Sequence, residues 1–251
     1  MDKISVVINT YNAEDVLAET LKSLKCFDEI VVCDMESSDN TVEIAKQYGC
    51  KVVTFPKENH HSAEPARTFA IQSASHKWVL VVDADEEVTP ALRDYLYDRI
   101  KKKDCPAGLY IPRKNFFMGR FMRATYPDFQ LRFFIKEGTV WPPYVHTFPK
   151  VNGRLEKLPR SRKELAFVHH DPNSIFARLK KTNDYSESEV DKKKEKNYGV
   201  VALFWRPFFR FFKAYILKKG ILDGVPGFIW AAYEGIYQFV IVSKCIEKRK
   251  K

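Results

Sequence analysis

Four short apolar runs, separated by stretches with helical spacing, dominate about the first ninety residues of this chain. The apolar runs lie at residues 4–8, 30–33, 51–55 and 78–82. The stretches between them show helical patterns over roughly 14–25, 40–48 and 64–75. Strands that alternate with helices predict a mostly parallel sheet covered by helices on both faces. In such a sheet, ligands bind beyond the carboxyl ends of the strands.

Polar residues that follow the runs are therefore expected to meet at one edge of the sheet. After the first run the chain reads Asn-Thr-Tyr-Asn at 9–12, and after the second it reads Asp-Met-Glu-Ser-Ser-Asp-Asn-Thr at 34–41. Hydroxyl, amide and carboxylate groups of this kind can bind a nucleobase or a ribose. A turn followed by a helix N-cap explains the second cluster equally well, so both interpretations stay open.

The strongest local motif is the triplet Asp83-Ala84-Asp85 after the fourth run. Two carboxylates at a strand end can both approach a divalent cation, and their hard oxygens suit Mg²⁺ or Mn²⁺. Such a cation would neutralise charge on a diphosphate. The alternative is an acidic loop that begins the next helix, which the following Thr89-Pro90 would favour.

Composition narrows the classes of partner and compartment. The chain has 251 residues, of which 45% are hydrophobic, and a net charge of +10. This suits one large domain, or one domain with an appendage, and an anionic partner. The five cysteines lack CxxC spacing, which favours a reducing compartment over disulfides or zinc. The first residues lack a secretory pattern, so we expect a catalytic side in the cytoplasm.

Taken together, the three clusters resemble the family 2 glycosyltransferases, which have the GT-A fold. The matching stretches are VVINTYNAED, IVVCDMESSDNTVEIA and WVLVVDADEEVTP. The later PDFQLRFFIKEGTVW, VHT, HHD and KAYILKKGILDG resemble the WaaE-like or KdtX-like transferases that extend lipopolysaccharide cores. The resemblance implies an inverting, metal-dependent hexosyltransferase. Its donor would be a nucleoside-diphosphate sugar, with UDP favoured, and its acceptor a lipid-linked glycan.

The resemblance also implies roles for individual residues. The nucleoside would be held by Thr10, Tyr11, Asn12, Glu14, Asp34 and Asp39. Asp83 would face the ribose or the metal, Asp85 would bind Mn²⁺ or Mg²⁺ directly, and His169 would add a late metal ligand. Arg67 matches the position of a basic residue near the diphosphate, and the alternative is a surface arginine on a helix.

An inverting displacement needs a general base for the acceptor hydroxyl, and a carboxylate or histidine is usual. The candidates are Asp128, then His146, then Asp171. A turn residue is the alternative for Asp128, and a structural histidine is the alternative for His146. The chain also departs from the family pattern at two positions. Met35 stands where many relatives carry a second aspartate, and Thr147 stands where they often carry glutamate.

The second half of the chain is less regular. Residues 108–112 and 129–135 are predicted strands of a mixed region, and the lysine-rich residues 191–196 form a hinge or an exposed helix. We expect three parts: a nucleotide-sugar-binding half at 1–105, an acceptor-binding half at 106–190 and a helical, membrane-associating tail at 191–251.

The tail is rich in aromatic residues. Arg206, Arg210 and Lys213 recur at i, i+4 and i+7 within the aromatic stretch 200–219. This predicts a helix at a lipid interface with its bases toward anionic headgroups, and packing on the catalytic domain is the alternative. We therefore expect a peripheral enzyme on the inner face of the cytoplasmic membrane.

The stretch that follows is harder to place. Residues 224–243 could just span a bilayer, but Glu234 in the middle argues against it. We favour a shallow or re-entrant helical hairpin that turns near residues 220–227.

Other classes of protein remain as alternatives. One is a non-catalytic nucleotide-sugar-binding protein, and another is a basic protein that binds nucleic acid or membranes. The basic residues concentrate after residue 154, beside aromatic ones and outside any nucleic-acid-binding module, so no nucleic-acid partner is expected. The loop after the first run has no GxGxxG, which argues against a dehydrogenase.

Overall fold

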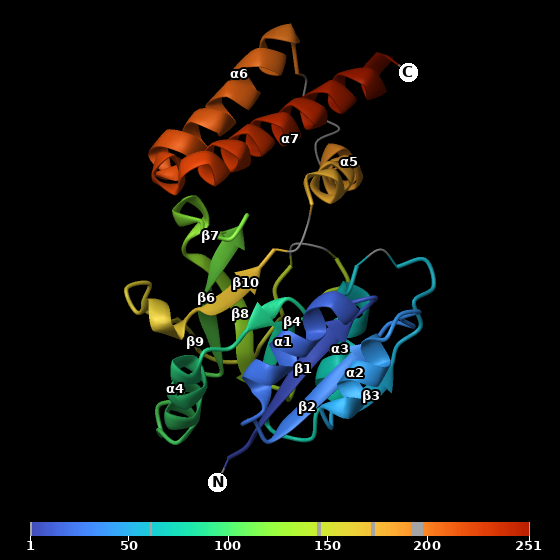
Figure 1. The fold of residues 1–251 in the computed structure, drawn as a ribbon, viewed down its shortest axis with the longest axis vertical. Helices are drawn as coiled ribbons and strands as arrows, with labels where there is room; N and C mark the ends of the chain where they lie inside the picture. The colour runs from blue at the N-terminus through green and yellow to red at the C-terminus, as the bar shows by residue number, and fades with distance from the viewer. Residues whose placement is uncertain (1, 61, 145–146, 172–173, 192–197, 251) are drawn as a thin grey trace. The chain divides into compact units, whose positions relative to one another are not determined.

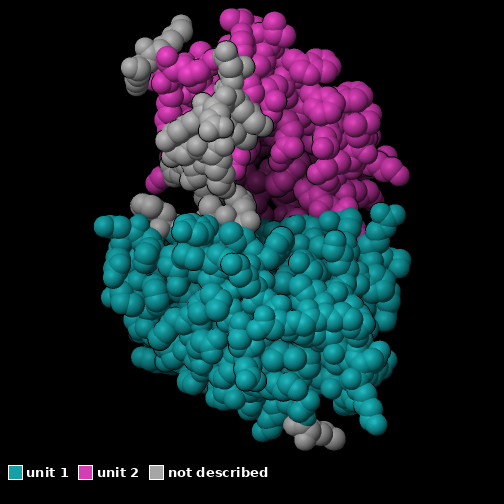
Figure 2. Space-filling view, turned by 180° about the vertical axis from the view of Figure 1, so that it is seen from behind, with its two compact units in different colours: residues 1–114, 127–170 teal, residues 115–126, 171–251 magenta. Residues whose placement is uncertain are grey.

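The computed structural model describes residues 2–60, 62–144, 147–171, 174–191 and 198–250. The chain forms two compact units, coloured separately in Figure 2: residues 1–114 with 127–170, and residues 115–126 with 171–251. These units differ from the three ranges expected from the sequence. Segment 115–126 groups with the C-terminal residues because Arg123 binds the carboxylate of Asp223 at 3.2 Å.

A parallel sheet forms the first half of the first unit (Figure 1), in the spatial order β3–β2–β1–β4. Its strands are β1 (Ile4–Thr10), β2 (Glu29–Asp34), β3 (Lys51–Thr54) and β4 (Trp78–Asp83). Every residue of β1 is buried, as expected for a central strand that is covered on both faces.

Helices cover both faces of this sheet. The core of one face joins apolar side chains of α1 (Glu14–Leu24), α2 (Thr41–Gln47) and α4 (Pro90–Ile100) with those of the strands. The core of the other face joins α3 (Glu64–Gln72) with the strands. The sequence-based prediction of a mostly parallel sheet with helices on both faces is therefore confirmed.

Antiparallel strands extend the sheet beyond β4, in the order β8–β6–β10–β5. They are β8 (Asp128–Ile135), β6 (Gly108–Phe117), β10 (Phe167–His170) and the short β5 (Glu86–Glu87). Two further strands, β9 (Leu155–Lys157) and β7 (Arg120–Phe121), also pair with β6, and β7 lies in the second unit. The strands expected at 108–112 and 129–135 are confirmed within β6 and β8.

The second unit is mostly helical and contains a helical hairpin (Figure 1). Its elements are α5 (Ile175–Asp191), α6 (Val200–Phe212), a π-helical turn (Lys213–Leu217), a 3-10 turn (Gly220–Asp223) and α7 (Gly224–Lys250). Helices α6 and α7 pack against each other along the hairpin. The chain reverses where Lys219 and Gly224 adopt positive φ angles of 62° and 65°, as the sequence predicted. Of the lysine-rich stretch, residues 192–196 lie outside the described residues.

Close backbone contact holds the hairpin together. A Cβ at Gly235 would lie 3.2 Å from the carbonyl oxygen of Pro207, so α6 and α7 approach tightly at this point. At the turn, a Cβ at Gly227 would lie 2.0 Å from the carbonyl oxygen of Gly220. Only glycine fits the second position without a shift of the backbone.

The basic stripe expected on α6 is not fully open to a partner. Arg210 binds Glu234 of α7 at 3.0 Å, and Arg206 lies over the Tyr198 ring at 5.0 Å. These two arginines therefore pack within the unit. Arg210 does so because the Glu234 carboxylate, at the middle of an apolar helix, needs a cation. Among the described residues, one helical stretch, Gly220–Arg249, is long and apolar enough to cross a membrane by length and composition.

Candidate active site

The polar residues at the strand ends fall on two faces of the sheet. Alternate residues of a strand point to opposite faces. Asp34 therefore shares the α1 and α2 face with Val32, and Asp83 shares the α3 face with Val81. Both carboxylates stand at the carboxyl edge and flank the end of β1, because Thr10 pairs with Asp34 in the register of the strands.

Asp34 is buried and held by the loop that follows it. Its Oδ1 accepts a hydrogen bond from Thr10 Oγ1 at 3.1 Å, and its Oδ2 accepts one from the Ser37 amide at 2.9 Å. Asn12, whose φ is 47°, accepts a hydrogen bond from the Ser38 amide through Oδ1 at 2.8 Å. The loops after β1 and β2 thus hold each other in place. Met35, the family departure, is buried in the core of the α3 face.

Asp39 and Glu14 also join these two loops. Asp39 accepts hydrogen bonds from the Thr41 amide at 3.0 Å and the Glu14 amide at 3.1 Å. Glu14 accepts hydrogen bonds from the Asn40 amide and side chain at 3.0 and 2.7 Å. Desolvation raises the pKa of Asp39, but the bonds from Thr41 and Glu14 outweigh it and hold that pKa below its usual value. Both carboxylates therefore anchor the first turns of α1 and α2.

Tyr11 presents an aromatic surface at the same edge. Its side chain is 49% exposed, and Lys57 Nζ lies 4.7 Å from the centre of its ring. An exposed aromatic ring beside a cation suits stacking with a nucleobase.

Asp83 is surrounded by arginines. Arg132 donates to both of its oxygens, at 3.1 and 2.6 Å, and Arg67 donates to Oδ1 at 3.0 Å. Nη1 of Arg113 lies 3.9 Å from Oδ2. Burial raises the pKa of Asp83, but the guanidinium groups of Arg132 and Arg67 outweigh burial and hold that pKa well below its usual range. Asp83 is thus already paired with positive charges of the protein itself.

Arg67 has spare hydrogen-bonding capacity. Its guanidinium group is buried and lies 4.6 Å from the centre of the Trp141 ring. Nε and Nη1 have no hydrogen-bond partner among the residues that the structure describes. Both side-chain polar atoms of Asn9, which pairs with Asp83 in the register of the strands, are likewise buried without a described partner. Such groups are costly in an empty protein and therefore indicate a ligand or water site.

Asp85 has different neighbours from Asp83. Its Oδ2 lies 3.4 Å from His169 Nε2, and its carbonyl oxygen accepts a hydrogen bond from the His170 amide at 3.2 Å. The pairing of β10 with β5 places His169 beside this turn. Burial lowers the pKa of His169, but the hydrogen bond to Asp85 outweighs it and raises that pKa above its usual value.

The Asp85–His169 pair suits a metal that is shared with a substrate. No cluster of three or more His, Cys, Asp or Glu side chains that could hold a metal occurs in the described ranges. Mg²⁺ and Mn²⁺ at phosphate sites are held by one or two protein ligands, and the phosphates and water complete the shell. A carboxylate with an imidazole fits that requirement, whereas Asp83 is occupied by arginines.

Asp128 belongs to the same network through Arg113, a residue that the sequence did not single out. Arg113 donates to Asp128 Oδ2 from Nε at 2.9 Å and from Nη2 at 2.7 Å. Its Nη1 donates to Glu86 Oε1 at 3.1 Å, and Glu86 is fully buried. Arg113 thus links the turn after β4 to the start of β8. Alternation along β6 could have shown that it points inward, but its partners could not be inferred.

The other two candidate bases have different placements. Asp171 lies in the second unit, where it forms an ion pair with Arg178, whose guanidinium carbon is 4.3 Å from the centre of the Phe117 ring. His146 lies outside the described residues. The other candidate site residues all lie in the first unit: Thr10, Tyr11, Asn12, Glu14, Asp34, Asp39, Arg67, Asp83, Asp85, Asp128 and His169.

This chain is similar to known proteins in both sequence and fold. The family model for glycosyl transferase family 2 matches residues 5–155. An uncharacterized glycosyltransferase of Rickettsia typhi is 26% identical over 98% of this chain and 88% of its own length. The lipopolysaccharide core biosynthesis glycosyltransferase LpsC of Rhizobium meliloti is 24% identical over 98% of this chain and 92% of its own. The UDP complex of S. aureus TarS 1-349 has a similar fold, with a TM-score of 0.54, 17% identity and coverage of 98% and 91%.

Proposed function

Because the chain belongs to glycosyl transferase family 2, we propose that it moves a hexosyl group from a nucleoside-diphosphate sugar to a lipid-linked glycan of the lipopolysaccharide core type. The observation that carries this proposal is Arg67. Its guanidinium group is buried at the carboxyl edge of a parallel sheet, and two of its nitrogens have no hydrogen-bond partner in the described part of the chain. A diphosphate supplies the acceptor oxygens that such a group lacks.

The nucleoside is proposed to lie across the ends of β1 and β2. Tyr11 would stack on the base. Thr10 and Asn12 at the end of β1, together with Asp34 at the end of β2, would define the ribose pocket. UDP is the favoured nucleotide, as the resemblance to the family implies. The name of LpsC supports the proposed class of acceptor, and the UDP bound to TarS supports the proposed nucleotide.

A divalent cation, Mn²⁺ or Mg²⁺, would be held by Asp85 with His169. When bound, it would neutralise the charge that builds on the leaving diphosphate. Arg67 would act on the same diphosphate from the α3 side, and Asp83 would orient Arg67 through their 3.0 Å ion pair.

The transfer itself is proposed to invert the anomeric carbon. The acceptor hydroxyl attacks that carbon, the bond to the diphosphate breaks, and a base takes the hydroxyl proton. Asp128 is the proposed base, because Arg113 connects it to the turn that carries Asp83 and Glu86.

The proposed location is the inner face of the cytoplasmic membrane. A lipid-linked acceptor is confined to a membrane, and the apolar helical hairpin of the second unit supports attachment there.

The donor class is tested by thermal shift with UDP, GDP and CDP, each with and without Mn²⁺. A ligand that binds only the folded state raises the melting temperature. We expect the largest rise with UDP and Mn²⁺ together. Negligible shifts with all three nucleotides would contradict the proposal. A separate assay distinguishes an enzyme from a protein that only binds nucleotide sugars: Mn²⁺-dependent hydrolysis of a UDP-sugar that disappears in Asp85→Ala would exclude the latter.

The base is tested by Asp128→Asn. Removal of a general base typically costs about 10²–10⁴ in rate. We expect transfer to fall by that order while stabilisation by UDP and Mn²⁺ remains, because the nucleotide is bound by other residues. Unchanged transfer in a folded Asp128→Asn variant would remove Asp128 from this role.

A further inference from the structure

The C-terminal hairpin exposes an unusually continuous apolar surface. Large apolar side chains along α6 stand open to solvent, including Phe204 at 72%, Phe208 at 61% and Trp205 at 60% exposed. The exposed series continues through the turn and into α7 with Ile216, Leu217, Ile221, Leu222, Val225, Phe228, Ile236 and Phe239. A surface of this size on a protein marks a site for another molecule.

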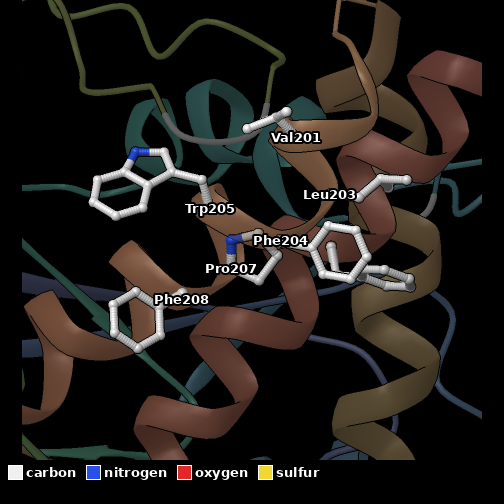
Figure 3. A pocket seen from close by; sticks show the side chains of 7 residues that line it. Val201, Leu203, Phe204, Trp205, Pro207 and Phe208 are labelled. Atoms are coloured by element: carbon white, nitrogen blue, oxygen red, sulfur yellow. The ribbon is translucent and has the colours of Figure 1, made fainter.

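The surface is hollowed along α6. A groove of about 660 Å³ lies there, and its lining is almost entirely apolar. Figure 3 shows the side chains that line it. Its lining residues are Val201, Leu203, Phe204, Trp205, Pro207, Phe208 and Phe239. A groove lined almost entirely by apolar side chains suits a hydrocarbon chain better than a sugar or a nucleotide.

Within residues 198–246 of the hairpin, no negative charge is left without a positive partner. The two carboxylates within residues 198–246 are Asp223 and Glu234, and each is paired with an arginine, at 3.2 and 3.0 Å respectively. By contrast, three lysines at the turn, Lys213, Lys218 and Lys219, are exposed. The turn therefore presents positive charge next to apolar surface.

This combination identifies the partner by its chemistry. A second copy of the hairpin would bring lysines toward lysines with no free carboxylate in residues 198–246 to offset them. A nucleic acid would match the charge but would not cover an aromatic and aliphatic surface. A bilayer with anionic headgroups offers both hydrocarbon and negative charge.

The length of α6 favours insertion of the hairpin into one leaflet of the bilayer. Helix α6 has 13 residues, about 20 Å at 1.5 Å per residue, whereas the hydrocarbon core measures about 30 Å. A spanning hairpin would also carry the lysines of the turn through hydrocarbon and hold the Arg210–Glu234 pair within it. Lysines beside an apolar face instead extend their ammonium groups to headgroups from a shallow position.

We propose that the α6–α7 hairpin lies in one leaflet of an anionic bilayer, with lipid acyl chains in the groove lined by Phe204, Trp205 and Phe208. The lysines of the turn contact the phosphate groups of the lipids. This proposal adds detail to the membrane location given under the proposed function. It rests on the proposed function only for the identity of the acceptor. The binding itself requires neither donor nor acceptor.

The test is flotation of the full chain with vesicles of phosphatidylcholine alone or mixed with phosphatidylglycerol. We expect binding to the mixed vesicles, weaker binding as salt increases, and little binding to phosphatidylcholine alone. The double variant Phe204→Ser, Phe208→Ser should bind at least about tenfold more weakly. The control Tyr144→Ser changes a side chain that is 71% exposed in the first unit and should bind like the unaltered chain.

Charge is tested separately with Lys213→Gln, Lys218→Gln. This variant should lose the preference for phosphatidylglycerol, whereas Lys3→Gln, Lys46→Gln, which changes exposed lysines of the first unit, should keep it. Equal binding to both kinds of vesicle by the unaltered chain, or binding to neither, would overturn the inference. A soluble dimer that is lost in the phenylalanine variant would assign the groove to a second copy and also overturn it.

The depth of the hairpin in the bilayer is measured on the unaltered chain, so the result does not depend on whether a variant folds. Tryptophan fluorescence, to which Trp205 and Trp230 of the hairpin contribute, should be quenched more by lipids brominated near the headgroup than by lipids brominated at the chain end. The reverse order would overturn the shallow position. Because these measurements use no nucleotide, lost vesicle binding with retained stabilisation by UDP would reject the membrane inference alone.

Discussion

Asp83 and Asp85 are two residues apart, yet the charges around their carboxylates differ. Three guanidinium groups lie within 4 Å of Asp83, and its pKa is held well below the usual range against the effect of burial. Asp85 faces the imidazole of His169 instead. The first aspartate therefore organises arginines, and the second is the one that we propose as a cation ligand.

A matched pair of variants separates these roles. Asp83→Asn should lower the free energy of unfolding by about 3–5 kcal/mol, because it leaves buried arginines without their counter-charge. Asp85→Asn should leave stability nearly unchanged and abolish the extra stabilisation that Mn²⁺ gives to the UDP complex. Denaturant unfolding and thermal shift measure the two effects. An exchange of these two phenotypes would contradict the assignment.

Asn9 offers a second test on a single side chain. Its amide is buried with no described hydrogen-bond partner, so Asn9→Leu, of similar size, should not lower the melting temperature of the empty protein. The same change should weaken UDP binding by about tenfold if the amide contacts the ligand. Titration followed by fluorescence gives the affinity. A clear loss of stability would indicate that the amide is already satisfied in the free protein.

At the edge of the sheet opposite the candidate site, the side chain of Glu29 holds β1 and β2 in register. Glu29, at the start of β2, accepts hydrogen bonds from Ser5 Oγ and from the Ser75 amide and hydroxyl, the latter two at 2.7 and 2.6 Å. One carboxylate thereby ties together the starts of β1 and β2 and the segment before β4. The register in turn aligns the strand ends that form the candidate site.

Glu29 also gives these elements a pH dependence. Desolvation raises the pKa of Glu29, but hydrogen bonds from Ser5 and Ser75 outweigh it and lower that pKa in the folded state. A depressed pKa stabilises the fold above the unfolded value of about 4.3, and this contribution is lost as pH falls through the folded pKa. Glu29→Gln should cost about 1–2 kcal/mol at neutral pH and progressively less in acid.

Urea unfolding over a pH series measures that dependence. Glu19→Gln is the control, because the Glu19 side chain is exposed and pairs only with Lys22 one helical turn away among the described residues. Exposed pairs of this kind contribute little to stability. A constant difference between Glu29→Gln and the unaltered chain at every pH would contradict the proposed role of the ionised carboxylate.

At the level of the full chain, two units carry two kinds of surface. The first unit holds the polar edge with its arginines and carboxylates, and the second holds the apolar hairpin. We expect their ligands to act separately. UDP with Mn²⁺ should slow hydrogen exchange near residues 9–12, 34–41 and 83–86, and anionic vesicles should slow it in residues 200–239. Protection of the hairpin by UDP alone would contradict this separation.

Local patterns were sufficient for much of this architecture. The alternation of apolar runs with helical spacing predicted the parallel sheet, its covering helices and the carboxyl edge, because periodicity is set by residues that are close in sequence. The family resemblance followed from motifs at the same strand ends. The hairpin turn near Gly220 was predictable as well, because glycines and a polar break interrupt two apolar stretches.

Contacts between distant residues settled the rest. The sequence kept Asp83 as a possible metal ligand beside Asp85 and did not single out Arg113. The partners that distinguish the two aspartates come from β6, β8, β10 and α3. It also placed Arg206 and Arg210 toward lipid, whereas Glu234 and Tyr198 occupy them from across the unit. The electrostatic environment of a side chain depends on which charges lie near it in space, and the local sequence pattern does not contain that information.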